Sequence, residues 1–203
     1  MRAQCNDEAT KAEWRARLSA ARAAVSVAEQ VAEAAALISA VSEMSAVSAR
    51  SLAGTVCGYV PFDGEPGSIG LLDALRGRGV RVLLPVVPAD PGPLDWAEYR
   101  GTASLAPGRF RRILEPTGPR LGPGAVAEAG LVLVPALAVD HRGVRLGRGA
   151  GHYDRSLAHA APGAGLVAVV RDAELVERLP AEDHDVRVTG VLTPGRGHVR
   201  LPL

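Results

Sequence analysis

Two short segments of this sequence are apolar at every position, and they constrain the fold more than any other feature. They are LVLV (131–134) and LVAVV (166–170). Successive side chains of a strand point to opposite faces of a sheet, so a strand that is apolar throughout must be covered on both sides. Such strands are typical of parallel sheets flanked by helices, which is the α/β class.

An earlier part of the chain predicts the same architecture. We expect a strand at 55–61, a helix at 66–76 and a second strand at 80–86. A strand, a helix and a strand at this spacing form a βαβ unit, whose strands are parallel and joined by a right-handed crossover.

The N-terminal region predicts two helices. Helical spacing of Trp14 and Leu18 predicts a first helix from Thr10 to about Ala24, with Thr10 as the N-cap. A longer helix follows. Its buried stripe is expected to comprise Val27, Val31, Ala34, Ile38 and Val41.

The remaining segments complete the expected fold. Residues 85–123 are rich in proline and glycine and are expected to form loops with edge strands at 94–99 and 109–114. Further elements are expected at 125–129 (a helical turn), 152–160 and 173–179 (helices) and 188–192 (a strand). We therefore predict one α/β domain over 1–203, with N-terminal helices (10–50) packed alongside a core (55–194) that has a parallel-rich sheet and helices on both faces.

Composition and charge narrow the functional classes. The chain has 203 residues, with 23 Lys and Arg against 22 Asp and Glu, so no dedicated nucleic-acid surface is expected. No apolar run approaches the roughly 20 residues of a membrane helix, and no export signal is visible. Cys5 and Cys57 form neither a CxxC pair nor a zinc-like cluster. These features predict a cytoplasmic protein without a nucleic-acid or membrane partner.

The densest chemical signal is RLGRGAGHYD (145–154), which precedes a predicted helix. Alternating glycines allow a tight turn whose N–H groups face an anion at the helix start, and Arg145 and Arg148 add positive charge. The motif is neither a Walker A loop, which needs Gly-Lys, nor a dinucleotide fingerprint, which needs a small residue in place of His152. From these residues alone, a phosphate site and a structural turn are equally favoured.

A longer segment around this motif carries a family resemblance. VPALAVDHRGVRLGRGAGHYDRSL (134–157) resembles the signature of the 5-formyltetrahydrofolate cyclo-ligase family, also called methenyltetrahydrofolate synthetase. KAEWR (11–15), YVPFDGE (59–65) and LPAEDHDVRVTGVLTP (179–194) follow the family pattern in the same order. The resemblance implies a fold similar to sugar-phosphate isomerases and CoA transferases.

The resemblance also implies an activity. Members of this family close 5-formyltetrahydrofolate to 5,10-methenyltetrahydrofolate in a reaction that uses ATP and Mg²⁺ and releases ADP and phosphate. The implied partner is this small-molecule folate, with or without a polyglutamate tail, and the implied state is a monomer or weak homodimer. Two alternatives stay open: a non-catalytic nucleotide- or folate-binding paralogue, and a sugar-phosphate isomerase-type enzyme.

Site residues are implied position by position. The ATP site would comprise Lys11, Arg15, Arg145, Leu146, Gly147, Arg148, Gly149, Ala150, Gly151, His152 and Tyr153. The folate site would comprise Arg15, Val60, Glu65, Arg148 and His152. Arg148 and Tyr153 would be catalytic, and Asp154 and Asp185 would bind Mg²⁺. The carboxylates suit this oxygen-preferring ion.

Ordinary structural roles compete with several of these assignments. Lys11 and Arg15 also fit a solvated helix face, and Asp154 fits a helix cap favoured by the dipole. Asp140 is expected to orient the glycine loop. Trp96, Tyr99 and Phe110 are candidates for covering the aromatic body of the folate, but core or edge packing is expected for each. The basic cluster Arg109, Arg111 and Arg112 fits a solvated edge better than a binding site for a glutamate tail.

Three positions depart from the family pattern. His152 stands where relatives commonly carry Tyr or Phe, Ala150 where some carry lysine, and Thr189 where an aspartate is common. These changes bear on the aromatic wall of the pocket, on phosphate contact and on the magnesium shell.

Overall fold

The computed structural model describes residues 9–47, 54–182 and 185–203, and a seven-stranded sheet forms its centre. Across the sheet, the strands are β12 (Gly197–Arg200), β11 (Gly190–Thr193), β9 (Gly165–Val169), β6 (Ala129–Pro135), β1 (Thr55–Cys57), β2 (Arg81–Val86) and β3 (Asp95–Glu98). Pairing is parallel from β11 to β2, whereas β12 and β3 are antiparallel to their neighbours. The predicted α/β class and the parallel-rich sheet are confirmed.

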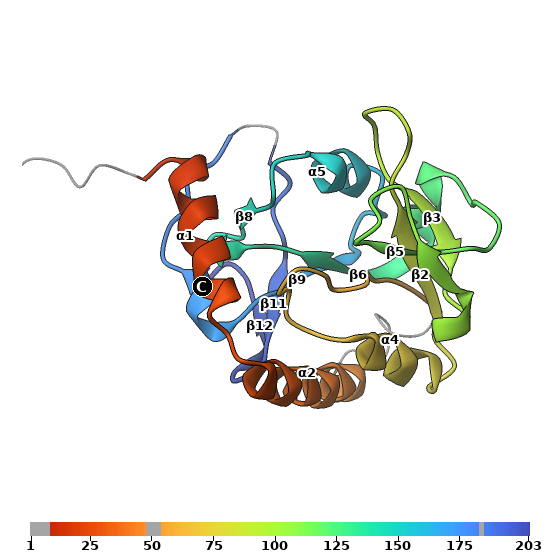
Figure 1. The fold of residues 1–203 in the computed structure, drawn as a ribbon, viewed down its shortest axis with the longest axis horizontal. Coiled ribbons are helices and arrows are strands. Elements are labelled where there is room, and N and C mark those ends of the chain that lie inside the picture. The colour runs from red at the N-terminus through yellow and green to blue at the C-terminus, as the bar shows by residue number, and fades with distance from the viewer. Residues whose placement is uncertain (1–8, 48–53, 183–184) are drawn as a thin grey trace, which may run out of the picture.

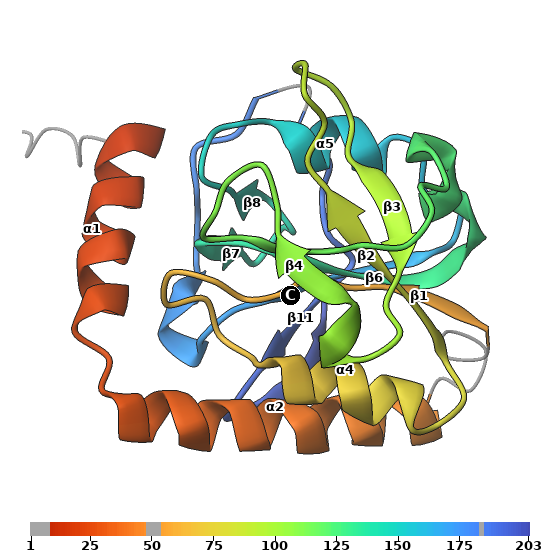
Figure 2. The same cartoon turned by 45° about the vertical axis from the view of Figure 1, so that its right-hand side comes forward.

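Apolar side chains cover both faces of this sheet, as the unbroken apolar runs require. In β6, Leu131 and Leu133 belong to one core cluster, and Val132 and Val134 belong to another. The first cluster lies under α2 (Val27–Val47) and α4 (Ile69–Arg76), which run side by side along one face (Figures 1 and 2). The second lies on the opposite side with α5 (His152–Leu157) and the 3₁₀ segment η2 (Pro123–Glu128). The sheet is therefore enclosed on two sides.

The first helix begins where the sequence predicts. Thr10 caps α1 (Lys11–Ala23), and a capping box joins its side chain and backbone to Glu13. Leu18 of α1 packs against a small sheet formed by β7 (Ala138–Asp140), β8 (Arg145–Leu146) and β10 (Leu175–Val176). This contact holds α1 against the α/β body, away from α2 (Figure 2).

The predicted buried stripe of α2 is wrong in its first half. Val27 and Val31 are 76% and 65% exposed, and the buried side chains are instead Leu37, Ala40, Val41 and Met44. These four residues follow helical spacing, but only the second half of α2 lies over the sheet, because its first turns extend past the sheet toward α1 (Figure 2). The periodicity of the sequence indicates a helix, but it does not show which turns of that helix pack against the rest of the protein.

Several predicted boundaries change. The helix expected at 173–179 is replaced by a 3₁₀ turn η3 (Asp172–Glu174) followed by β10, and the edge strand expected at 109–114 is mainly the turn between β4 (Leu105–Pro107) and β5 (Leu114–Pro116). The strand expected at 55–61 ends at Cys57, and the helix expected at 152–160 ends at Leu157. Another 3₁₀ segment, η1 (Thr102–Ser104), precedes β4.

Two structural findings bear on the expectations about the cysteines and about membrane spans. Cys57 is a buried free thiol, while Cys5 lies outside the described residues. Within the described ranges, no single helix is both long and apolar enough for a membrane span. Helices α1 and α2 meet the length and composition test only as a pair, and they are bent by 103° at the break between them.

Candidate functional site

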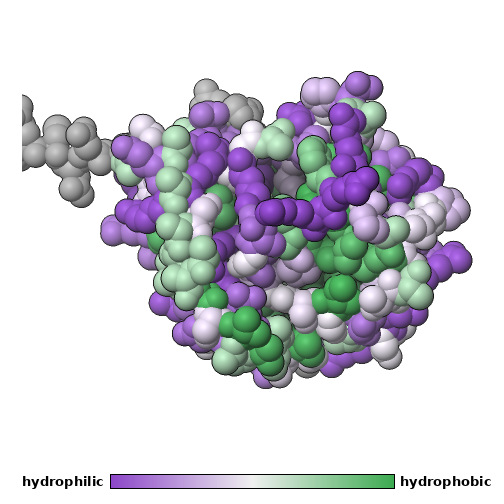
Figure 3. All heavy atoms as spheres, viewed as in Figure 1, coloured by the Kyte–Doolittle hydropathy of each residue, from purple (hydrophilic) through white to green (hydrophobic). Residues whose placement is uncertain are grey.

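A cavity of about 640 Å³ opens beyond the carboxyl ends of β1, β2 and β6. This is the edge of a parallel sheet at which α/β proteins collect ligands. It is lined by residues of α1, the segment after β1, the β4–β5 turn and the 145–154 loop, and by Glu182 and Asp185. Figure 3 shows this side of the molecule hollowed near its upper edge, with hydrophilic residues on both flanks of the hollow.

The structure brings together every predicted site residue. All of the residues assigned to ATP, folate, catalysis and magnesium line this one cavity: Lys11, Arg15, Val60, Glu65, the loop 145–154 and Asp185. The chain contributes them from positions far apart in sequence. Their roles remain proposals, but their common location agrees with a single binding site.

The glycine loop has a backbone conformation that favours glycine at two positions. Gly149 has φ +103° and Gly151 has φ +68°, and Gly151 is the N-cap of α5. Gly147 has another requirement, because a Cβ there would lie 2.8 Å from Arg145 Nη1. The loop therefore needs its glycines for backbone conformation and for the close approach of an arginine.

Arg145 lies under the loop in a nearly buried position. Its Nη2 donates a 2.7 Å hydrogen bond to Asp154 Oδ1, and its guanidinium carbon lies 5.8 Å from the centre of the Tyr153 ring. Among the described residues, Arg145 Nε is buried without a hydrogen-bond partner. Asp154 thus forms an ion pair, and no side chain caps α5, so the cap role considered for Asp154 is wrong.

Helix α1 supplies two cations to the cavity wall. Lys11 Nζ contacts Asp185 Oδ2 at 2.9 Å and Glu182 Oε1 at 3.3 Å. Arg15 Nε donates to the carbonyl of Gly147 at 2.9 Å. These contacts turn the basic side of α1 toward the cavity, so the solvated-face role considered for Lys11 and Arg15 is wrong.

The turn that follows β1 places an acid against the glycine loop. Glu65 is nearly buried, and its Oε1 lies 3.5 Å from Arg148 Nε. Burial raises the pKa of Glu65, although the Phe62 N–H and the Arg148 charge oppose this increase. Arg148 also binds Asp63 through a 2.9 Å hydrogen bond and lies over the Phe62 ring. Sequence analysis missed Asp63 and Phe62 because nothing in the local pattern shows that they meet a loop 85 positions away.

Two tyrosines remain protonated at neutral pH. Burial, aided by the nearby Glu65 carboxyl, raises the pKa of Tyr153 and of Tyr59 far above the ordinary tyrosine value. Tyr59, which the sequence analysis did not assign to the site, lines the cavity and donates a 3.2 Å hydrogen bond to the Pro66 carbonyl. A protonated Tyr153 hydroxyl can donate a hydrogen bond but is a poor proton acceptor.

The carboxylates are suitable ligands for a divalent ion. Asp154 and Asp185 line the same cavity, and each is paired with a cation, Arg145 or Lys11. Among the described residues, no cluster of three His, Cys, Asp or Glu side chains could hold a metal ion. Two carboxylates with phosphate oxygens and water still fit the coordination preference of Mg²⁺, so the pair is compatible with an ion delivered together with a nucleotide.

Residues that depart from the family pattern have distinct surroundings. His152 lines the cavity and its Nδ1 lies 3.0 Å from the Gly92 carbonyl, and Ala150 also lines the cavity. Thr189 does not line it; its hydroxyl bonds the backbone of Leu166. The concern that Thr189 alters a magnesium shell has no support in this geometry.

The structural roles expected for three aromatic residues and for Asp140 can also be compared with the structure. Trp96 and Tyr99 are buried core residues, as expected. Phe110 is 53% exposed at the cavity wall, so its predicted packing role is wrong. Asp140 is fully buried and accepts hydrogen bonds from the N–H groups of Arg142, Val144 and Leu179, which fixes the turn that leads to β8.

Comparisons with known proteins agree with this architecture. The model of the 5-formyltetrahydrofolate cyclo-ligase family matches residues 7–194. A 5-formyltetrahydrofolate cyclo-ligase of Mycolicibacterium smegmatis is 56% identical over 152 residues, covering 72% of this chain and 77% of that protein. The Escherichia coli K12 protein of the same name is 33% identical over 151 residues, covering 71% and 80%.

Solved structures show the same fold. The 5,10-methenyltetrahydrofolate synthetase of Aquifex aeolicus superimposes with a TM-score of 0.74 and 26% identity, covering 94% of this chain and 92% of that one. A synthetase from Mycoplasma pneumoniae has a TM-score of 0.68 at 17% identity, covering 89% and 96%, and this similarity supports the fold alone.

Proposed function

Because the chain belongs to the 5-formyltetrahydrofolate cyclo-ligase family, we propose that it closes 5-formyltetrahydrofolate to 5,10-methenyltetrahydrofolate at the expense of ATP. The observation that carries this proposal is one cavity that joins a glycine loop and several cations to a buried carboxylate. This arrangement suits an anionic nucleotide next to a heterocycle rich in N–H donors. The family assignment favours this reaction over sugar-phosphate isomerase chemistry.

The reaction needs activation because an amide oxygen is a poor leaving group. The formyl oxygen attacks the γ-phosphorus and ADP departs, which leaves a phosphorylated formyl group. The N10 amine then forms a bond to the formyl carbon, phosphate leaves, and N10 loses its proton. Such phosphoryl transfer asks the protein mainly for positioning and charge neutralisation.

Cationic side chains in the cavity would neutralise the phosphates. Arg148 and Lys11 line the cavity, and Arg15 holds the glycine loop through the Gly147 carbonyl. The backbone N–H groups of the loop add donors next to the N-terminus of α5. We propose that Arg148 and Tyr153 donate hydrogen bonds to the reacting phosphoryl or formyl oxygens.

Asp154 and Asp185 would hold Mg²⁺ together with the nucleotide. When bound, this ion supplies charge neutralisation at the phosphate oxygens. The ion would compete for each carboxylate with the cation that it binds in the structure, Arg145 or Lys11. A displaced cation would remain beside the incoming phosphates, so the charge of the site would stay balanced.

The folate would occupy the end of the cavity next to Glu65. The Glu65 carboxylate would accept hydrogen bonds from the pterin N–H groups, and Val60 and His152 would contact the ring system. We further propose that the enzyme acts in the cytoplasm as a monomer or weak homodimer.

One assay tests the proposal. Purified protein is mixed with 5-formyltetrahydrofolate, Mg²⁺ and ATP, and the ultraviolet absorbance of the methenyl product is followed, with reactions lacking ATP or containing EDTA as controls. ATP-dependent product formation is the expected result. Binding of ATP or folate without product would instead identify a non-catalytic binding protein, and no interaction with either would reject the proposal.

A further inference from the structure

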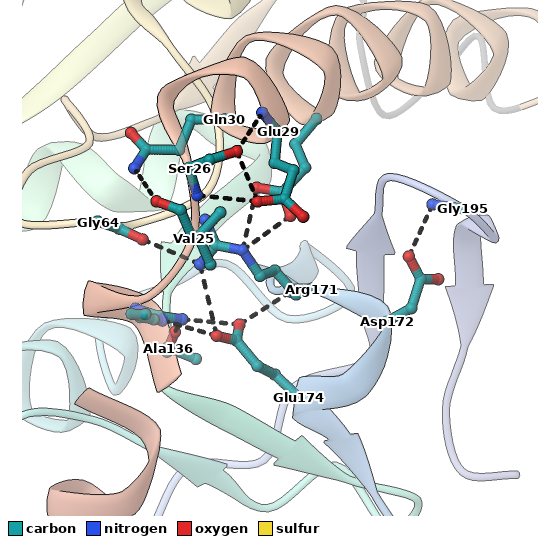
Figure 4. A network of polar contacts seen from close by, with 12 residues as sticks. Val25, Ser26, Glu29, Gln30, Gly64, Ala136, Arg171, Asp172, Glu174 and Gly195 are labelled. Atoms are coloured by element: carbon teal, nitrogen blue, oxygen red, sulfur yellow. Dashed lines mark hydrogen bonds and ion pairs between the residues drawn. The ribbon is translucent and has the colours of Figure 1, made fainter. Parts of the chain in front are cut away.

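A buried ionic network lies behind the cavity, at the junction between α1 and α2 (Figure 4). Arg22 of α1 binds both carboxylate oxygens of Glu174, at 2.7 and 2.8 Å, and also donates to the Ala136 carbonyl at 2.6 Å. Arg171, which follows β9, joins the same acid: its backbone N–H donates to Glu174 Oε2 at 2.8 Å. The network thus fixes two arginines around one buried glutamate.

Arg171 connects this network to two other parts of the chain. Its Nε donates to both carboxylate oxygens of Glu33 in α2, at 2.8 and 3.0 Å, and its Nη1 donates to the Gly64 carbonyl at 3.0 Å. Figure 4 shows the bond to Gly64 and those to the acids leaving the guanidinium in different directions. A planar group with several fixed donors can make these contacts together, whereas an ammonium cannot.

Gly64 belongs to the turn that presents Glu65 to the cavity. The Glu65 N–H donates to the Phe62 carbonyl, and the two residues between them, Asp63 and Gly64, have φ values of +51° and +75°. Positive φ at both central positions is the requirement of a type I′ turn, and Asp-Gly is one of the residue pairs that favour it. The local sequence therefore sets the shape of the turn, whereas its contacts with other segments set where the turn stands.

The turn is held from two sides. On the cavity side, Arg148 binds Asp63 and Glu65, and on the far side Arg171 binds the Gly64 carbonyl. A nucleotide phosphate that recruits Arg148 would remove the first support. The Arg171 bond does not involve the cavity, since Arg171 does not line it, and it would persist through the reaction.

We propose that Arg171 is a positioning residue: by fixing the Gly64 carbonyl, it holds the Glu65 carboxylate in place for the pterin ring when Arg148 turns to the nucleotide. This inference rests on the proposed function, because it assigns a role to a residue outside the site in the binding of that folate. It predicts that loss of the Gly64 bond weakens folate use while leaving ATP use nearly unchanged.

The test compares two variants that damage the same ionic network in different places. Arg171→Lys keeps the positive charge, but its compact ammonium lacks the widely spaced donors by which the guanidinium reaches Glu33 and the Gly64 carbonyl at once. The control, Glu33→Gln, weakens the contact of Arg171 with α2 but leaves its bond to Gly64. Melting temperatures and far-ultraviolet circular dichroism establish that each variant is folded, and Arg171→Gln replaces Arg171→Lys if the latter is insoluble.

The readout is the Michaelis constant for each substrate, together with calorimetric binding of 5-formyltetrahydrofolate in the presence of Mg²⁺ and a non-hydrolysable ATP analogue. For Arg171→Lys we expect the folate KM to rise about tenfold, as for a lost charged hydrogen bond that orients a binding group. In Arg171→Lys, the KM for ATP should change by less than about twofold. In Glu33→Gln, the KM for folate and the KM for ATP should each change by less than about twofold.

Three results would overturn the inference. They are an unchanged folate KM in folded Arg171→Lys, an equal rise in both KM values, or an equal rise in Glu33→Gln, since the last two indicate a general structural role. Wild-type protein that binds folate but makes no product would reject only the proposed function, and the calorimetric comparison would then decide the inference. Wild-type protein that does neither would overturn both.

Discussion

Three cations that line the cavity are held in ion pairs: Lys11 with Asp185, Arg145 with Asp154, and Arg148 with both Glu65 and Asp63. In each case the cation is proposed to bind phosphate. Its carboxylate partners are proposed to bind Mg²⁺ (Asp154 and Asp185) or folate (Glu65), and Asp63 lies in the same turn as Glu65. When nucleotide, metal and folate bind, each would therefore take the place of an ion-pair partner of one of these side chains. Such an exchange avoids leaving a buried charge without a partner, which is costly.

The first residue-scale prediction concerns Arg148. In Arg148→Ala, we expect kcat/KM for ATP to fall roughly ten- to hundredfold if the guanidinium donates to phosphate. This corresponds to a loss of about 1.5 to 3 kcal/mol of transition-state stabilisation. Because this side chain is 36% exposed, its ion pairs should contribute less than about 1 kcal/mol to stability. Steady-state kinetics and urea unfolding separate the two effects. Unchanged kinetics would remove Arg148 from the site.

A second residue-scale prediction concerns Glu65. Burial raises the pKa of this carboxyl in the folded protein, so its ionisation opposes folding at pH values above its ordinary pKa, and the penalty disappears as the pH falls and the carboxyl protonates. Glu65→Gln should therefore melt at a higher temperature than wild type at pH 7, with the difference shrinking toward pH 4. A glutamine can still accept the hydrogen bond from the Phe62 N–H.

The same Glu65→Gln variant should bind folate less well. Its amide presents N–H donors to a pterin edge that also donates, so we expect the folate KM to rise about tenfold or more. Thermal scans at several pH values and the absorbance assay measure both effects. A variant that is destabilised at pH 7 yet uses folate normally would contradict both assignments of Glu65.

At the scale of elements, the glycine loop and α5 depend on two kinds of glycine. Gly151 begins α5 with a left-handed backbone, whereas Gly147 has ordinary φ but lies against Arg145. A Cβ at Gly151 would also lie 2.7 Å from Arg155 Nη1, but Arg155 is exposed and can move, whereas Arg145 is buried. Alanine therefore mainly disturbs the backbone at Gly151 and a buried arginine at Gly147.

Gly151→Ala should lose about 1 to 2 kcal/mol of stability, since a Cβ is unfavourable at its φ of +68°. Gly147→Ala should be more stable than Gly151→Ala but should impair ATP use, because the new Cβ displaces Arg145 from its place beside Asp154. Denaturant unfolding and the ATP KM distinguish the two. Equal stability losses would show that Gly147 also serves the backbone.

The sequence predicts those elements whose signal is local. The apolar runs at 131–134 and 166–170 lie in central parallel strands, Thr10 caps α1, and the glycine motif forms the cavity loop. The exposed Val27 and Val31 were mispredicted because helical periodicity does not reveal which turns have a neighbour. Strands of two or three residues, such as β8 and β10, are too short to show a period of two.

The site shows the same division between local and distant information. Gly149, Gly151 and Arg148 are readable because they share one short motif, and the rest of the proposed site came from a family resemblance. Contacts such as Arg148 with Asp63, and Arg22 with Glu174, join segments 85 and 152 positions apart. Only the folded chain shows these pairs, since nothing in either segment specifies the other.

At the scale of the whole molecule, Cys57 is a probe of global opening. It lies fully buried in β1 at the centre of the sheet, and burial raises the pKa of its thiol to about 12. In a Cys5→Ser background, we expect an aromatic disulfide reagent at pH 8 to label the native protein only as fast as it unfolds. Full labelling in denaturant is the control, and rapid labelling of native protein would show that the sheet opens locally.

The wall of the cavity begins at Thr10 and ends at Asp185, and Lys11 meets Asp185 across 174 positions of sequence. During synthesis, a chain that emerges N-terminus first holds α1 long before its partner has been translated. The binding site therefore comes into being only after Asp185 has been translated. Substrate present in the cell can stabilise the folded enzyme but cannot assist the chain before that point, so earlier folding must rely on apolar contacts.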